Sequence, residues 1–313
     1  MRMRRYKLEF REAVYHVCSR VVDRQFKFDD QTKNDFQKIL WKVATFSGVE
    51  LITYVLMTDH FHVLVRVHPK WTEVGQEEVL RRVGVLYGGL KKQWLKNKLA
   101  YFVEAKDNTA AEALLDSYRS RMNDISEFMK TLKLRMTINF NIKHNREGTL
   151  WEGRFHSVLL EDSIESKLLR FVAAYIDLNP VRAGMVGDSG SYRWCGYANA
   201  CGSSCWAEQG GQGIASLYAK MPEESLDCYG RFLRARAAKK GLVKASRKTE
   251  GSRMLTDVHV RNDALVRSRL IGSRAFIENV AGKRPAGGVT SFESGDCGPL
   301  LVVGRFKKRS KLA

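Results

Sequence analysis

The chain has 313 residues, is 44% hydrophobic and carries a formal net charge of +19. Its size and apolar content suffice for one large domain or two smaller ones, and its charge favours a polyanionic partner, nucleic acid first and a membrane surface second. No run of about 18 apolar residues is present, which argues against a membrane-spanning helix, and the basic start MRMRRYKLEF lacks the apolar stretch of a signal peptide.

The six cysteines form no CxxC pair, which together with size and charge is typical of a reducing cytoplasm with free thiols. Cys195, Cys201 and Cys205 lie together in a stretch rich in glycine and serine. Their spacing matches no standard zinc finger and no histidine is near, so a zinc site is not favoured there.

The first third of the chain reads as strand, helix, strand, strand. Residues 13–22 have the composition of a strand. Residues 29–48 predict a helix with an aspartate cap at its start and a glycine at its end. Residues 49–67 form a long apolar strand or a hairpin, with the break at Thr58 and Asp59. This order predicts an α+β fold, a ferredoxin-like split βαβ antiparallel sheet with helices.

Residues 72–140 are expected to be mostly helical, with Gly88 and Gly89 as a break. A polar loop and a short strand, FHSVLL, follow. The next helix is expected to start at Asp162, where a capping box is possible, and to stop just before Pro180, because proline disfavours α geometry in the residue before it.

The composition changes near residue 187, which predicts three parts. Residues 1–187 form a catalytic domain, residues 188–230 a connection rich in glycine, serine and cysteine, and residues 231–313 a basic, mainly helical C-terminal region that is a candidate for DNA binding. Within the last part, residues 263–282 contain two short helical patterns around Ile271, read as a helix-turn-helix DNA reader or as a helical hairpin packed on the sheet.

The stretch MTDHFHVLVRV, Met57–Val67, carries two histidines on one face of a strand. With a period of two, His60 and His62 share a face, whereas Phe61 and Val63 share the other, apolar face. Such a pair can chelate a divalent ion, although two ordinary half-buried histidines would give the same pattern.

Tyr175 and Asn179 are four residues apart and lie on one face of the helix that ends near Pro180. A phenol can act as a nucleophile when its target is polarised, and most helical tyrosines simply pack. A metal ion held by two histidines and a neutral oxygen could polarise a phosphate, and Asn179 could supply that oxygen. This ligand set suits Mg²⁺ or Mn²⁺ better than structural zinc.

Three blocks, MTDHFHVLVRV, GTLWEGRFHSVLLED and YIDLNPVRAGMV, resemble the REP-associated tyrosine transposases of the HUH single-strand transposase superfamily. They occur in the family's order, and the resemblance covers roughly residues 10 to 200. It implies that His60 and His62 are the metal-binding pair, that Tyr175 is the catalytic tyrosine, and that Asn179 is a third ligand. Asp59 replaces the asparagine of many members, and we expect its side chain to point to the opposite face.

The resemblance implies a bacterial, nucleoid-associated enzyme of the cytoplasm, a transposase or endonuclease that depends on Mg²⁺ or Mn²⁺. It would cleave and rejoin single-stranded DNA at hairpin (palindromic) sites through a 5′-phosphotyrosine, as a monomer or a homodimer. Trp151, Arg154 and Phe155 combine stacking surface with charge and are candidates for DNA binding, as is Arg182; Trp151 and Phe155 could equally be core residues. His68 and His156 are expected to lie outside the paired face.

Two other functions stay open at this point. One is a domesticated DNA-binding protein that keeps the fold without the activity. The presence of every expected catalytic residue argues against it. The other is an unrelated metal-dependent hydrolase whose basic surface serves RNA.

Overall fold

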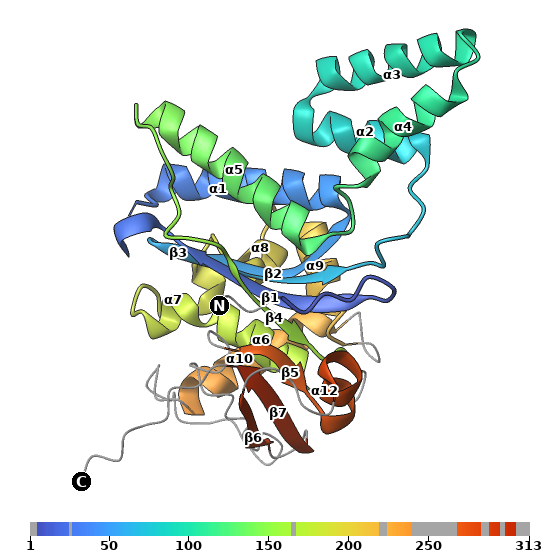
Figure 1. Cartoon of the computed structure of the whole chain (residues 1–313). Helices are drawn as coiled ribbons and strands as arrows, with labels where there is room; N and C mark the ends of the chain where they lie inside the picture. Colours follow the sequence, from blue (N-terminus) through green and yellow to red (C-terminus); the bar gives the residue numbers. More distant parts are fainter. Residues whose placement is uncertain are drawn as a thin grey trace.

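The computed structural model describes residues 5–24, 27–163, 167–218, 224–239, 268–282, 288–294 and 298–304. Its strands form one seven-stranded sheet in the order β2-β3-β1-β4-β5-β7-β6 (Figure 1). The strands are β1 (Ala13–Arg20), β2 (Val49–Leu56), β3 (His60–Val67), β4 (His156–Leu160), β5 (Ser268–Gly272), β6 (Gly288–Ser294) and β7 (Gly298–Gly304).

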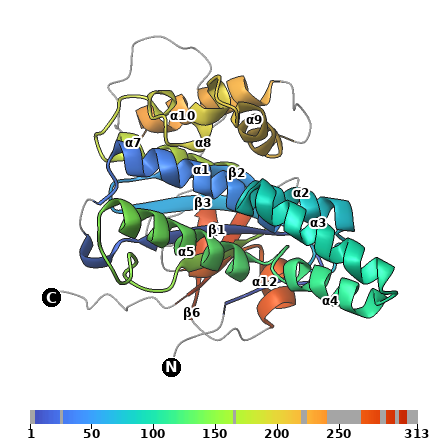
Figure 2. The ribbon, with the colours of Figure 1, turned by 90° about the horizontal axis from the view of Figure 1, so that it is seen from above.

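Helices cover both faces of this sheet, and α2, α3 and α4 lie beyond its end (Figures 1 and 2). The described helices are η1 (Val22–Arg24), α1 (Asp30–Ser47), α2 (Gln76–Tyr87), α3 (Gly89–Glu104), α4 (Asn108–Arg119), α5 (Ile125–Lys143), α6 (Leu168–Asp177), α7 (Asn179–Arg182), η2 (Ser189–Ser191), α8 (Gly196–Cys201), α9 (Ala207–Ala215), α10 (Ser225–Lys239) and α12 (Arg274–Ala281).

The unit β1-α1-β2-β3 follows the sequence pattern closely. The Asp29 side chain accepts a hydrogen bond from the amide of Thr32 and so caps α1, and Gly48 ends the helix in the left-handed region at φ 63°. The turn between β2 and β3 falls at Thr58 and Asp59, so the predicted hairpin is confirmed.

Strands β2, β3, β1 and β4 are antiparallel neighbours, with β3 between β2 and β1. This is the strand order of a split βαβ unit, and α1 and α5 lie side by side on one face of it (Figure 1). The predicted α+β, ferredoxin-like class is confirmed.

The two faces of β3 pack against different helices. On the α1 and α5 face, the Phe61 ring packs on Phe36 of α1 with ring centroids 4.9 Å apart. On the opposite face lies α6, whose Asp177 accepts a hydrogen bond from Thr53 of β2. Because side chains alternate along a strand, His60 and His62 share the α6 face.

Helix α6 begins at Leu168, so the predicted start at Asp162 is wrong. The Asp162 carboxylate instead accepts a hydrogen bond from Arg66 of β3 at 2.9 Å. The helix ends at Asp177, as the position of Pro180 predicts.

The segment predicted as a connection, residues 188–230, contains helices that pack on β2. A side chain at Gly213 of α9 would come within 2.2 Å of the Leu51 carbonyl oxygen, and one at Gly196 of α8 within 2.2 Å of Thr53. Glycine is needed at both positions because the helices approach the strand backbone so closely.

The C-terminal region adds β5, β7 and β6 to the sheet, with β5 parallel to β4, beside α10 and α12. The predicted pair of helices over residues 263–282 is therefore wrong: Ser268–Gly272 is a strand and only Arg274–Ala281 is a helix. Residues 263–267 lie outside the described residues. Leu270 and Ile271 are fully buried, and a short apolar run of this kind suits a sheet interior as well as a helix.

Candidate active site

His60 and His62 lie on the α6 face of β3, with ring centroids 5.2 Å apart. His60 is partly exposed and His62 is buried. The predicted pairing of the two rings on one face is therefore observed.

Each imidazole is oriented by a bond to its Nδ1 atom. His60 Nδ1 lies 2.5 Å from Asp59 Oδ1, and His62 Nδ1 lies 2.9 Å from Nε2 of His16 on β1. The expectation that Asp59 points to the opposite face is wrong, because Asp59 sits in the β2–β3 turn, where strand alternation does not apply. His16 was missed from the sequence, since only the sheet brings β1 beside β3.

Burial lowers the pKa of His60, against the opposing effect of Asp59. It also holds the pKa of His62 well below its usual range, and the nearby His16, His60, Arg182 and Arg20 act in the same direction. Both effects favour the neutral imidazole, the form that binds metal ions.

Tyr175 of α6 packs edge-on against the two buried histidines. Its ring centroid lies 5.8 Å from that of His62 and 6.1 Å from that of His16. The phenol is partly exposed, so solvent or a substrate can reach it. The structure thus brings the predicted tyrosine to the predicted histidine pair, although 113 residues of sequence separate Tyr175 from His62.

Arg182 of α7 lies over Tyr175. Its guanidinium carbon is 4.3 Å from the centre of the phenol ring, and the side chain donates a hydrogen bond to the Tyr175 carbonyl oxygen. Burial lowers the pKa of Arg182. This places a cation beside the phenol and close to His62.

Asn179 caps the end of the tyrosine helix. Its Nδ2 atom donates to the carbonyl oxygens of Tyr175 at 3.1 Å and Ile176 at 3.2 Å. These bonds engage the amide nitrogen, so a ligand role would fall to Oδ1. In the described part of the chain, no hydrogen bond joins Asn179 to His60 or His62.

Asp177, two residues after Tyr175, is fully buried and ties α6 to three other elements. It accepts hydrogen bonds from Thr53 of β2 at 2.8 Å, from the Tyr229 hydroxyl of α10 at 2.6 Å and from the Tyr197 amide of α8 at 3.3 Å. Burial raises its pKa to about 6. Sequence reasoning missed this anchor, whose partners lie 20 to 124 residues away in the chain.

The candidate DNA-binding residues Trp151, Arg154 and Phe155 differ in burial and in their place in the fold. Trp151 is buried among Phe28, Phe36 and Phe61 on the far face of the sheet, and its indole donates to the Lys133 carbonyl oxygen. It offers no face for a base, so the alternative reading of Trp151 as a core residue is the one that the structure supports.

Phe155 and Arg154 are placed differently from Trp151. Phe155 is half-buried, and the guanidinium of Arg5 lies 3.8 Å from its ring centre. Arg154 is exposed. A role for either residue in DNA binding stays a prediction.

His156 of β4 lies on the same face as the histidine pair. Cys18 of β1 is the register partner of both His62 and His156, so the three side chains form one row across the sheet. The expectation that His156 is outside this face is wrong. Burial lowers its pKa to about 4, helped by Arg269 and Arg5. His68 lies just past the end of β3 and contacts Glu12.

The donor set fits a divalent ion held jointly by protein and substrate. With each Nδ1 bonded to a neighbour, the Nε2 atoms of His60 and His62 are left for a metal, which is the usual arrangement of ligating histidines. Within the described ranges, no three His, Cys, Asp or Glu side chains are grouped to hold a metal. The remaining ligands would have to be Asn179, phosphate oxygens and water.

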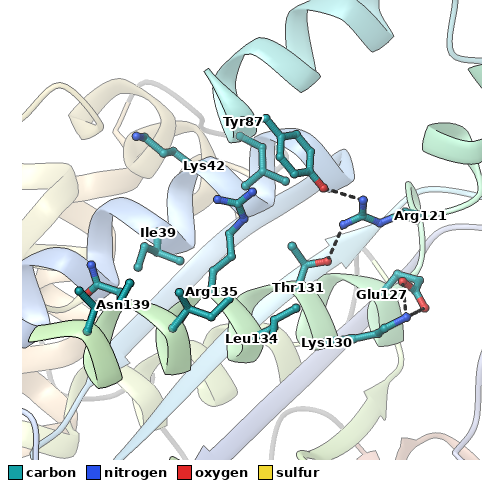
Figure 3. A pocket seen from close by; sticks show the side chains of 13 residues that line it. Ile39, Lys42, Tyr87, Arg121, Glu127, Lys130, Thr131, Leu134, Arg135 and Asn139 are labelled. Atoms are coloured by element: carbon teal, nitrogen blue, oxygen red, sulfur yellow. Dashed lines mark hydrogen bonds and ion pairs between the residues drawn. The ribbon is translucent and has the colours of Figure 1, made fainter. Parts of the chain in front are cut away.

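A groove of about 660 Å³ lies on the opposite side of the sheet, between α1, α2 and α5 (Figure 3). Leu134 and Ile138 form part of its apolar lining, and Arg121 donates to the Tyr87 hydroxyl at one end. Its one lining carboxylate, Glu127, is bonded to Lys130. None of the residues that line it is a histidine or a cysteine, so the candidate chemistry stays at the histidine face.

Cys195 is buried and donates to the Ser189 carbonyl oxygen, and the five described cysteines are free thiols. No helix in the described ranges combines the length and the apolar character needed to cross a membrane.

Residues 9–74, which span β1 to β3 and both site histidines, match the family model described as "Transposase IS200 like". The predicted resemblance is confirmed over these residues, which hold the first of its three blocks. The match supports a transposase-like, DNA-processing function. No curated protein matches it.

Two transposases are among the solved structures that are similar to the chain. The structure of a REP-associated tyrosine transposase bound to a REP hairpin is 13% identical, with 64% of this chain and 85% of that chain covered and a TM-score of 0.40. A transposase from Deinococcus radiodurans R1 is 16% identical, with 56% and 96% covered and a TM-score of 0.27. At these TM-scores the two likenesses carry no argument about this chain.

Proposed function

We propose that the protein is a metal-dependent single-stranded DNA transposase that cleaves and rejoins DNA at hairpin sites through a phosphotyrosine on Tyr175. One observation carries this proposal: the Tyr175 ring lies 5.8 Å from that of His62 while the Arg182 guanidinium covers it at 4.3 Å. A nucleophile, candidate metal ligands and a cation for phosphate are gathered on one face.

His60, His62 and Asn179 would hold the divalent ion, Mg²⁺ or Mn²⁺, which when bound would neutralise charge on the scissile phosphate. Asp59 and His16 orient the two imidazoles through their Nδ1 atoms. Arg182 supplies a fixed positive charge for a phosphate oxygen. Asp177 holds the end of α6 in place, so the phenol keeps its position.

In the reaction, the Tyr175 oxygen bonds to phosphorus and the bond from phosphorus to the 3′-oxygen breaks. The phenol loses one proton and the departing 3′-oxygen gains one, so the step leaves a 5′-phosphotyrosine and a free 3′-OH. Attack by a 3′-OH reverses it. One phosphodiester is exchanged for another, so no nucleotide hydrolysis is required.

The partner in this proposal is single-stranded DNA with a hairpin or palindromic structure, in the cytoplasm at the bacterial nucleoid, and the enzyme acts as a monomer or a homodimer. Support comes from the charge of +19 and the family match.

The test is a labelled single-stranded hairpin incubated with Mn²⁺ and enzyme, then separated under denaturing conditions. The parent protein should form a covalent adduct, and Tyr175→Phe should form none while binding the hairpin as before. Tyr218→Phe is the matched control, because Tyr218 is also half-buried beneath an arginine, at 5.2 Å from Arg170. An adduct that persists in Tyr175→Phe places the nucleophile elsewhere. No adduct with the parent protein favours a DNA-binding protein without the activity.

A further inference from the structure

Helices α2, α3 and α4 form an arm that projects beyond the end of the sheet (Figures 1 and 2). The arm begins at Gln76, after the last residue of the family match. Helix α3 packs on α2 and α4. The proposed chemistry of the histidine face uses no residue of this arm.

One side of α3 exposes large apolar side chains. The helix buries only Leu95 and Leu99, whereas Leu90, Trp94 and Tyr101 are 91%, 47% and 58% exposed. These three residues are spaced by four and seven positions and therefore lie along one stripe of the helix surface. An exposed stripe of this kind on a projecting helix indicates an interaction surface.

Lysines flank the stripe. The Lys91 ammonium lies 3.5 Å from the centre of the Trp94 ring, and the Lys98 ammonium lies 4.7 Å from that of Tyr101. Lys92 and Lys96 are exposed on the same helix but lie on its other side, away from the stripe. Among the residues that the structure describes, neither Lys91 nor Lys98 forms an ion pair, so their charge is open to a partner.

The chemistry of this surface selects its occupant. Aromatic faces interleaved with cations suit unpaired bases that stack and phosphates that need neutralising. A second copy of the chain would bring its own lysines against Lys91 and Lys98, which the net charge of +19 disfavours. A duplex would present phosphates but keep its bases stacked inside, leaving Trp94 and Tyr101 without a use.

We propose that the stripe of α3 binds the single-stranded DNA that flanks the cleaved hairpin, a proposal that rests on the proposed function. The arm follows Val67, at the opposite end of β3 from His60. An eight-residue strand is about 25 Å long, so the flank would meet α3 well away from the reacting phosphate.

The experiment measures binding, not cleavage, with Ca²⁺ as the added ion. Parent and variants are titrated with a hairpin without flanks and with the same hairpin carrying flanks of about 20 nucleotides, longer than a typical single-strand site of ~4–16 nucleotides. Trp94→Ala should weaken binding of the flanked hairpin roughly tenfold and leave the bare hairpin unchanged, because one stacked base is lost. Trp71→Ala, which truncates a tryptophan that is 74% exposed, is the matched control.

The lysines are tested through the salt dependence of the same binding. Lys91→Gln with Lys98→Gln should lower the slope of log affinity against log salt by about 1.4 for the flanked hairpin, or ~0.7 per phosphate contact. Lys38→Gln with Lys42→Gln removes the same charge from α1 and should change the slope less.

Three binding results would overturn the proposal: an equal loss of slope in both lysine pairs, unchanged binding in Trp94→Ala, or an equal loss of affinity when the flanks are duplex. A change in sedimentation without a change in DNA binding would overturn it as well. The variants alter exposed or half-buried side chains, and a melting curve for each checks the fold. Absence of an adduct in the parent protein, by contrast, concerns the proposed function alone.

Discussion

The two faces of β3 are built on opposite principles. Phe61 points into an aromatic cluster with Phe36 and Trp151, where the rings are held by packing and their faces need no hydrogen bonds. Its neighbour His62 points to the other face and is buried beside His16 and Tyr175, where every polar atom needs a partner. Burying polar groups costs free energy unless they are hydrogen-bonded, so the histidine face depends on paired polar atoms, whereas the aromatic face stabilises the sheet by packing.

The largest expected effect comes from the histidine face. His60→Ala or His62→Ala should abolish Mn²⁺-dependent cleavage of the hairpin and leave hairpin binding nearly intact, because ligands are lost and the basic surface is not. Cleavage gels and a binding titration check this. Full cleavage by either variant would remove the metal assignment from this pair.

On the aromatic face the effect should be on stability instead. Trp151→Ala should lower the free energy of unfolding by about 3–5 kcal/mol, the usual cost of truncating a buried tryptophan, while hairpin affinity of the folded protein stays unchanged. Urea unfolding measures the first quantity, and Trp71→Ala should change stability by less than ~0.5 kcal/mol. Weaker DNA binding by a folded Trp151→Ala variant would mean that Trp151 takes part in DNA binding after all.

The sequence predicted these two faces unequally well. Alternation along 57–67 and the caps Asp29 and Gly48 are local signals, so the βαββ unit and the pairing of His60 with His62 could be read directly. His16 and Asp177 could not, because each acquires its role from a partner 46 or more residues away in the sheet or helices. Trp151 illustrates the reverse case, since composition does not distinguish a stacking tryptophan from a core one.

The C-terminal strands show a further limit of sequence reasoning. The run around Leu270 and Ile271 is short and apolar, and periodicity alone does not separate a buried strand from a helix. The deciding factor is the free edge of β4, which β5 joins in parallel. That edge exists only after the first four strands have paired.

His156 gives the histidine face a pH dependence. Its pKa is about 4 in the folded protein, against 6.5 in the unfolded chain, so the unfolded chain binds the proton more readily. The neutral ring's contribution is fully present above pH 6.5 and is lost as the pH falls towards 4, by up to about 3 kcal/mol. His156→Gln should therefore lose less stability than the parent protein between pH 7 and 4, as urea unfolding at each pH would show. Parallel curves for the two proteins would mean that the ring is protonated without penalty.

The smallest expected effect concerns the hydrogen bond between His16 and the candidate metal ligand His62. For His62 to present Nε2 to a metal, its Nδ1 must carry the proton, which it then donates to His16 Nε2 at 2.9 Å. His16→Leu removes this acceptor and should weaken Mn²⁺ binding by about 10- to 100-fold, the usual cost of losing a partner behind a metal-ligating histidine. His16→Gln offers an amide oxygen at a similar reach and should recover part of the affinity.

Calorimetry or electron paramagnetic resonance of Mn²⁺ without DNA separates this orienting role from cleavage itself. If His16 only packs against Tyr175, leucine should serve as well as glutamine and the metal affinity of both variants should equal that of the parent protein. A loss in His16→Leu that His16→Gln restores would assign the effect to the hydrogen bond. The histidine face would then differ from the aromatic face in a measurable way, because a side chain there is needed for its acceptor atom and not for its volume.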